Sequence, residues 1–179
     1  MYIIRSKTQA KKYVWLEQLE KEYKFDSRDY ITGLSEPERT APYKVSHGTI
    51  FEDILGSGSG IYIHSRIKNE IEAANLTGFK FHPITIKFKK EIINDYFIMA
   101  PTKRCGPLDL SNSIDKPNPH ATFMNAKWGF EVDESFTNDL MMPKGMLFYV
   151  ISDKAATVLQ SIDPPISGLE ISHQDDCYF

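Results

Sequence analysis

The sequence has few cysteines and lacks any long apolar run, and both absences exclude classes of protein. The two cysteines among the 179 residues, Cys105 and Cys177, belong to no CxxC pair, which excludes a disulfide framework and a cysteine-rich zinc site. No apolar run approaches the ~20 residues that span a bilayer, and the N-terminus lacks the apolar stretch of a signal peptide. The sequence therefore predicts free thiols and a cytoplasmic protein that does not enter a membrane.

A phosphate-binding loop is also missing, although the segment GSGSG at residues 56–60 suggests one at first sight. In such a loop the glycines stand between a strand and a helix, and the N-terminus of the helix helps to hold the anion. Here the glycines precede the apolar run Ile61-Tyr62-Ile63, and no Lys-Ser or Lys-Thr pair follows them. We therefore expect a flexible lead into a strand at this point, and no cofactor.

Apolar residues are plentiful enough to form a core. They make up 41% of the chain, and the aromatic residues include 11 Phe and 9 Tyr, a composition that argues against disorder. A chain of this length is typical of one domain. We therefore expect residues 1–179 to form a single domain.

Charge is spread unevenly along the chain. Residues 1–90 carry 15 Lys and Arg against 11 Asp and Glu, whereas residues 91–179 carry 6 against 13. An acidic half repels the phosphates of nucleic acid and attracts a basic partner. A solvated acidic surface without a partner is the simpler alternative.

Local patterns predict an α+β fold with a mixed or antiparallel sheet and a few short helices. Apolar and polar residues alternate at 79–88, as in strands, and apolar residues near a 3.6-residue period at 8–24 favour a helix. Ser65 is the expected N-cap of a second helix, which Thr77-Gly78 ends. The other expected elements are strands at 2–4, 61–63, 95–99 and 146–151, a helix at 153–161, loops at 25–48 and an irregular segment at 101–127.

Two segments, residues 61–81 and residues 148–171, show the same order of features. In each, an apolar strand meets a serine, and an amphipathic helix, a glycine and an apolar–charged–apolar triplet follow. The spacing between helix and glycine differs, so the sequence indicates two similar strand–helix–strand units rather than a strict repeat. A chance likeness between two common arrangements is the alternative.

Candidate catalytic residues are His120 and Cys105, both in the irregular segment. A loop histidine can act as a general base, and Lys103 and Arg104 would lower the pKa of the neighbouring thiol. Neither candidate lies in a nucleophile motif such as GxSxG. A small cytoplasmic hydrolase-type enzyme that uses His120 or Cys105 is therefore an alternative function, and a surface thiol is the simpler interpretation of Cys105.

Acidic residues gather in two places in the second half of the chain. The segment HQDDC at residues 173–177 holds side chains that can bind a metal, but it lies next to the end of the sequence, where tails fray, and we expect no metal site. Glu131, Asp133, Glu134 and Asp139 form the other group. Paired carboxylates can perform acid–base chemistry, but this composition is more typical of a solvated or docking surface.

Three segments, taken in order, carry a resemblance to a known family. They are FEDILGSGSGIYIHSRIKNEIEAANLTGFKFHPI at 51–84, DYFIMAPTKRCGPLDLSNS at 95–113, and SDKAATVLQS at 152–161 with GLEI at 168–171. In this order they resemble family eleven of the immunity proteins of bacterial polymorphic toxin systems. The matching positions are structural rather than catalytic.

The resemblance implies inhibition by binding: such a protein occupies a co-encoded toxin domain and neutralises it without catalysis. An acidic surface would be steered towards a basic toxin such as a nuclease. We expect no direct contact with nucleic acid, and the oligomeric state stays open. The expected partner-binding residues are acidic or aromatic: Asp133, Glu134, Phe136, Asp139, Asp175, Asp176, Tyr178 and Phe179.

Overall fold

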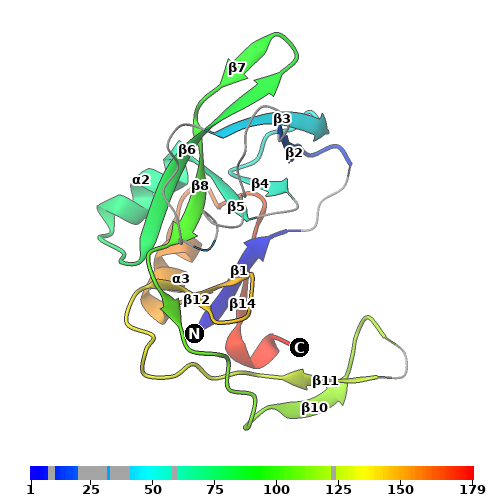
Figure 1. Ribbon diagram of the computed structural model, residues 1–179, viewed down its shortest axis with the longest axis vertical. Coiled ribbons are helices and arrows are strands. Elements are labelled where there is room, and N and C mark those ends of the chain that lie inside the picture. Colours follow the sequence, from blue (N-terminus) through cyan, green and yellow to red (C-terminus); the bar gives the residue numbers. More distant parts are fainter. Residues whose placement is uncertain (8–10, 20–31, 33–40, 58–59, 122–123) are drawn as a thin grey trace.

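The computed structural model describes residues 1–7, 11–19, 32, 41–57, 60–121 and 124–179, and it confirms the α+β class (Figure 1). Strands dominate, and the helices of the described residues are short. They are α2 (Ser65–Ala73), α3 (Asp153–Ser161) and the 3-10 turn η2 (Gln174–Asp176). None of these helices has the length and apolar content needed to cross a membrane.

The larger sheet has the strand order β3-β2-β4-β5-β8-β6-β7. Because β3 also pairs in parallel with β6, six of these strands close into a small barrel, and β7 extends from it as a hairpin with β6. The bounds are β2 Trp15–Gln18, β3 Ala41–His47, β4 Ile54–Ser57, β5 Ile61–His64, β6 Phe79–Phe88, β7 Glu91–Ile93 and β8 Tyr96–Pro101.

The smaller sheet has the order β14-β1-β13-β12-β9, and a separate hairpin pairs β10 with β11. The bounds are β1 Tyr2–Ser6, β9 Arg104–Cys105, β10 Ile114–Pro117, β11 Asn125–Trp128, β12 Leu140–Pro143, β13 Tyr149–Ile151 and β14 Leu169–His173. The β10–β11 hairpin lies at the opposite end of the molecule from the β6–β7 hairpin (Figure 1).

One apolar core joins the two sheets. It includes Ile4 and Tyr149 from the smaller sheet and Ile63 and Met99 from the larger one. The Tyr149 hydroxyl, at 2% residue exposure, donates to the Met99 carbonyl over 2.9 Å and so links the sheets at their centre. The core therefore holds the two sheets in a fixed relation.

The two strand–helix–strand units are confirmed as β5–α2–β6 and β13–α3–β14. Ser152 caps α3 as its type suggests, since its hydroxyl accepts from the Ala155 N–H at 3.1 Å. The expected cap Ser65 is wrong, however. His64 holds the N-cap position in an extended conformation, and its Nδ1 accepts a hydrogen bond from the Arg66 N–H at 3.1 Å. Any side chain with an acceptor in that place can satisfy one of the free N–H groups at the start of a helix.

The predicted helix at 8–24 is wrong where the structure describes it. Trp15–Gln18 is strand β2, in which Leu16 is buried and Glu17 is exposed, the alternation of a strand. This strand pairs on both sides, with β3 and β4, so tertiary pairing overrides the weak helical period. Residues 8–10 and 20–24 of the prediction lie outside the described residues.

Three other segments differ from expectation. The predicted loop at 25–48 contains strand β3, and its residues 25–31 and 33–40 lie outside the described residues. The irregular segment at 101–127 contains β9, β10 and most of β11. Gly56 stands within β4, not in a flexible lead, and a Cβ at this position would lie 2.6 Å from the Trp15 ring, so this contact requires glycine. Residues 58–59 of the predicted lead lie outside the described residues.

Candidate functional site

The C-terminal residues form an ordered part of the β10–β11 region. The Lys127 N–H donates to the Phe179 carbonyl at 3.2 Å, and the Phe179 N–H donates back to the Lys127 carbonyl at 2.9 Å. The Gly129 N–H also donates to the Cys177 carbonyl at 2.9 Å, so the tail runs beside β11 as a short antiparallel partner. The expectation of a fraying tail at 173–177 is therefore wrong.

Aromatic side chains hold this tail against the hairpin. The rings of Trp128 and Tyr178 lie 5.1 Å apart, and the Phe179 ring lies 5.9 Å from Phe130 and 5.7 Å from Phe148. Phe130 is 3% exposed, whereas Phe179 is 36% exposed. Phe179 thus packs on a small second core, whose buried members are Ile3, Phe130, Val150 and Cys177, whereas Tyr178 packs on Trp128. Both residues leave part of their surface to solvent.

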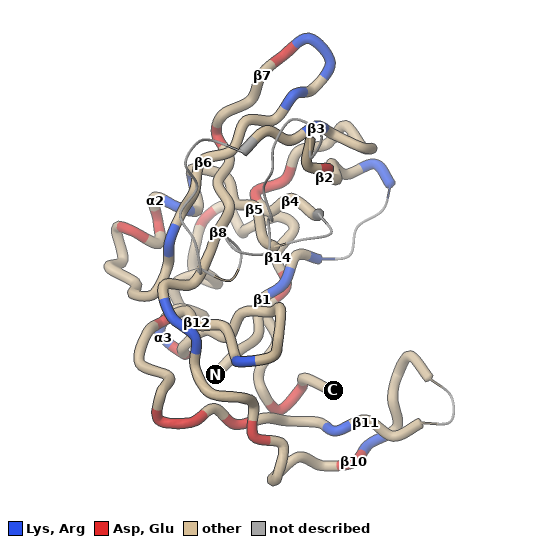
Figure 2. The backbone as a smooth tube through the Cα atoms, viewed as in Figure 1, with Lys and Arg blue, Asp and Glu red and all other residues tan. Residues whose placement is uncertain are grey.

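A cleft of about 290 Å³ opens between the hairpin, the loop before it and η2. We call it the acidic–aromatic cleft. Its floor and walls are formed by Asp109, Asn112, Ser113, Ile114, Lys116, Trp128, Gly129, Phe130, Glu131, Gln174 and Asp175. Three carboxylates face one cation in this set, so the cleft carries a net negative charge. Figure 2 shows acidic residues at this end of the molecule along the segments that lead into β10 and out of β11.

Hydrogen bonds fix two of the three carboxylates in place. A bridge joins Asp109 and Glu131, whose backbone N–H groups each donate to the other residue's carbonyl at 2.9 and 2.8 Å. The Asp109 carboxylate accepts from the Ser111 N–H at 2.8 Å, and this bond lowers the pKa of Asp109 below its ordinary value. The Glu131 carboxylate accepts from the Asn112 amide at 3.2 Å. Asp109 is therefore ionised at neutral pH.

The third carboxylate, Asp175, lies on the turn η2. Its Oδ2 lies 3.3 Å from His173 Nδ1, and the same nitrogen accepts from the Asp175 N–H. The cation of the cleft, Lys116, lies with its Nζ 5.5 Å from the centre of the Trp128 ring, so it stacks on the aromatic wall. The cleft thus combines anionic walls with an aromatic surface.

The other predicted partner-binding residues lie in several environments. Glu134 and Asp176 are exposed, and Phe136 packs against the second core. Asp133 is exposed, but its carboxylate accepts hydrogen bonds from Ser135 and Gly106, and the Ser135 bonds lower its pKa. A Cβ on Gly106 would lie 2.0 Å from this carboxylate, so the contact requires glycine.

Asp139 is not part of the exposed acidic surface. It is 9% exposed, and its carboxylate accepts from the Thr77 N–H at 2.8 Å and from the Ser152 hydroxyl at 2.6 Å. Burial opposes its ionisation, but these hydrogen bonds outweigh burial and lower its pKa. Asp139 therefore has a structural role, and its inclusion in a docking surface was wrong.

Neither alternative catalytic residue, Cys105 or His120, lies in an environment typical of a hydrolase site. Cys105 is fully buried in β9, and burial raises the pKa of its thiol, whereas a nucleophilic cysteine needs a lowered one. His120 is exposed, and its ring lies 5.7 Å from Tyr178. Within the described part of the chain, no group of three or more His, Cys, Asp or Glu could hold a metal.

Sequence reasoning missed Asp109, which stands in the segment expected to be irregular, and Trp128, which directly follows that segment. No local period marks them, because the cleft is assembled from a loop, a hairpin and the C-terminal turn. Comparison with known proteins does not assign the cleft: no protein-family model matches this chain, and no curated protein matches it.

Proposed function

We propose that this protein is an immunity protein that neutralises a basic toxin domain by binding it, with no catalytic step of its own. The observation that carries the proposal is the acidic–aromatic cleft. The resemblance of residues 51–84, 95–113, 152–161 and 168–171 to an immunity family supports the same conclusion. The expected cellular location is the cytoplasm, where the toxin would otherwise act.

The charge of the cleft favours a cationic partner. Asp109, Glu131 and Asp175 line a space in which Lys116 is the cation. A lysine or arginine side chain of the toxin would pair with them, and the field of the acidic half would speed the encounter. Arginine fits best, because its planar guanidinium binds carboxylates and also stacks on aromatic rings such as Trp128.

The size of the cleft favours a protruding side chain over a small-molecule substrate. Its volume of about 290 Å³ lies at the lower limit of ligand pockets, which span roughly 300–1,000 Å³. Ile114, at 62% exposure, stands on the hairpin beside it and adds apolar contact area. A stable complex buries roughly 1,600 Å² in total, so the hairpin and the tail would form the surrounding interface.

The test is a rescue experiment with the toxin-like domain encoded beside this gene. Cells express that domain alone, with this protein, or with a variant in which the cleft is neutralised by Asp109→Asn, Glu131→Gln and Asp175→Asn. The matched control neutralises three exposed carboxylates elsewhere, with Glu70→Gln, Glu91→Gln and Asp163→Asn. Both variants change the net charge equally, so a difference between them reports position and not charge alone.

We expect cells that express the toxin-like domain to survive with the wild-type protein and with the control variant. The cleft variant should bind that domain with at least tenfold lower affinity. The affinity gap should widen as salt is lowered, because screening then weakens. If the toxin kills equally with and without the wild-type protein, the proposal fails for that pairing. If the cleft and control variants bind alike, the protein binds through another surface.

A further inference from the structure

The two strand–helix–strand units share a complete sheet plan. In the larger sheet β8 lies between β5 and β6, and in the smaller sheet β1 lies between β13 and β14; the middle strand is antiparallel to both neighbours in each case. A further strand, β4 or β12, pairs antiparallel with the first strand of each unit. The orders β4-β5-β8-β6 and β12-β13-β1-β14 are therefore equivalent.

The registers are equivalent as well. When the two helices are aligned on their N-caps, His64 and Ser152, the residue before each cap faces the first residue of the preceding strand. The pairs are Ile63 with Ile54 and Ile151 with Leu140. In the middle strands, Met99 faces Ile61 and Phe81, and Ile4 faces Tyr149 and Ile171. The pairings on both sides of each middle strand give the same alignment of β1 with β8, in which Ile4 corresponds to Met99. A chance similarity in the order of elements would not produce this agreement.

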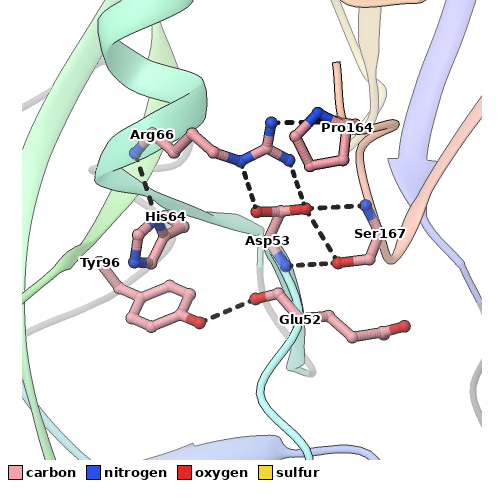
Figure 3. Close-up of polar contacts among 7 residues, drawn as sticks. All are labelled: Glu52, Asp53, His64, Arg66, Tyr96, Pro164 and Ser167. Carbon is pink, nitrogen blue, oxygen red and sulfur yellow. Dashed lines mark hydrogen bonds and ion pairs between the residues drawn. The ribbon is translucent and has the colours of Figure 1, made fainter. Parts of the chain in front are cut away.

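An aspartate directly before β4 binds the loop that follows α3 (Figure 3). The Asp53 carboxylate accepts from the Ser167 N–H and hydroxyl, both at 2.9 Å. The Asp53 N–H donates to the Ser167 hydroxyl at 2.8 Å, and the Ile54 N–H donates to the Ser167 carbonyl at 3.0 Å. The carboxylate also pairs with Arg66, two residues after the cap of α2, at 2.8 Å.

The aspartate directly before β12 repeats every one of these contacts on the loop that follows α2. The Asp139 carboxylate accepts from the Thr77 N–H and hydroxyl at 2.8 and 3.1 Å. The Asp139 N–H donates to the Thr77 hydroxyl at 3.1 Å, and the Leu140 N–H donates to the Thr77 carbonyl at 3.1 Å. Lys154, two residues after the cap of α3, lies 3.8 Å from this carboxylate. We call the two arrangements the aspartate clasps.

Each clasp and each middle strand crosses between the two halves of the chain. Asp53 and the loop it binds come from different units, as do Asp139 and its loop. Likewise β1 completes the sheet of the second unit, and β8 completes the sheet of the first. We infer that residues 1–93 and 94–179 are two copies of one unit, a strand followed by strand–strand–helix–strand, that have exchanged their first strands and clasp one another reciprocally.

The duplication separates a repeated framework from added segments. The first half inserts β2 and β3 between β1 and β4, and these strands close the barrel. The second half inserts β9, β10 and β11 between β8 and β12, and this insertion carries most of the acidic–aromatic cleft. If the proposed function holds, partner recognition lies in the segment that has no counterpart in the first half.

The first test replaces one middle strand by the other within the full chain. Residues 2–6, YIIRS, become FIMAP, the sequence of 97–101, which is the alignment that the registers give. A control uses IMAPT, the sequence of 98–102, so that every residue moves by one position and the faces are exchanged. We expect a cooperative melting transition for the aligned variant and none for the shifted one. Folding of both variants, or of the shifted one alone, would overturn the inference.

A second test decides the matter if neither strand variant folds. Thr77→Ser together with Ser167→Thr exchanges the hydroxyl residues of the two clasps. Because each residue type already fits the equivalent position, we expect the Tm to stay within about 2 °C of wild type. Thr77→Val and Ser167→Ala, which remove the hydroxyls, should each lower the Tm by about 4 °C. A drop for the exchanged pair as large as for these deletions contradicts the equivalence.

Discussion

Asp53→Asn tests how much one aspartate clasp contributes to stability. The carboxylate accepts from Arg66 Nε at 3.2 Å and Nη2 at 2.8 Å as well as from Ser167. The side chains of Asp53 and Arg66 are 17% and 27% exposed, so the pair is shielded from most solvent. Asparagine keeps one acceptor oxygen and replaces the other by an N–H₂ group, which would face donors.

The magnitude follows from the bonds that the variant loses. A hydrogen bond to a charged group contributes about 1.5–3 kcal/mol. The Asp53 carboxylate accepts four hydrogen bonds, and asparagine retains roughly half of them. Two lost bonds at the lower end of that range, as partial exposure requires, give about 3 kcal/mol. For a domain of this size, 1 kcal/mol shifts the Tm by about 2–4 °C, so we expect a fall of about 6–12 °C.

Two assays at pH 7, both followed by circular dichroism, measure the effect: guanidinium unfolding at 25 °C gives the loss in free energy, and thermal unfolding gives the fall in Tm. Glu72→Gln is the control. Glu72 also pairs with a cation, Lys68 at 2.7 Å, but it is 52% exposed and lies on one helix face. Such a pair contributes at most about 0.5 kcal/mol. If Asp53→Asn costs no more than Glu72→Gln, the clasp does not stabilise the fold and the reasoning is refuted.

The same variant has a predicted dependence on pH. Burial opposes the ionisation of Asp53, but hydrogen bonds from Arg66 and Ser167 outweigh it and hold its pKa below the ordinary value of 3.8. A carboxyl group whose pKa is lower in the folded protein than in the unfolded chain stabilises the fold at any pH above its unfolded-state pKa. That stabilisation is lost as the pH falls through the folded-state pKa. The difference between wild type and Asp53→Asn should therefore be constant from pH 7 to about 5 and shrink below pH 3.8.

Three further predictions concern glycine, thiols and the tail. Gly78→Ala should lower the free energy of chemical unfolding by about 3 kcal/mol or more, because φ of Gly78 is +85° and an added Cβ would lie 2.3 Å from a carbonyl oxygen. The control Gly145→Ala, at φ +79° and with no atom within 4 Å of the added Cβ, should cost about 1–2 kcal/mol. Cys105 and Cys177 are buried, so neither should react with Ellman's reagent in the native protein, and both should react in denaturant; a fast native reaction would contradict their burial. Phe179→Ala removes a partly exposed ring that packs on two others and should lower stability by about 2 kcal/mol in the same unfolding assay.

The sequence predicts those elements whose pattern is local. The alternation at 79–88 becomes β6, and α3 spans the predicted residues, Asp153–Ser161, with Ser152 as its cap. Leu16 and Glu17 show where local patterns fail as predictors. The helical period around them is weak, and pairing with a distant strand determines their conformation. The N-cap His64 was missed since a serine, the commoner cap, stands directly after it.

The candidate site was only half predicted, for a related reason. Asp175 and Tyr178 were expected at a partner surface, which stays a prediction; Asp175 lines the acidic–aromatic cleft, and Tyr178 packs on Trp128, another lining residue. Asp109 and Trp128 were not expected, because the fold brings them to Asp175 across a long stretch of chain. Asp139 shows the converse error: its charge suggested a surface, but the clasp places it inside.

The exchange of first strands sets an order on folding during synthesis. Among the described strands, β1 is made before all the others, and the strands that pair with it, β13 and β14, are made after all the others. The sheet of the first unit likewise waits for β8, so neither sheet can be completed from one half alone. Such non-local pairing slows folding and leaves strand edges unpaired in the meantime. A chain that stops short of β14 would leave β1 without one of its two neighbours and expose an edge that can pair with other chains.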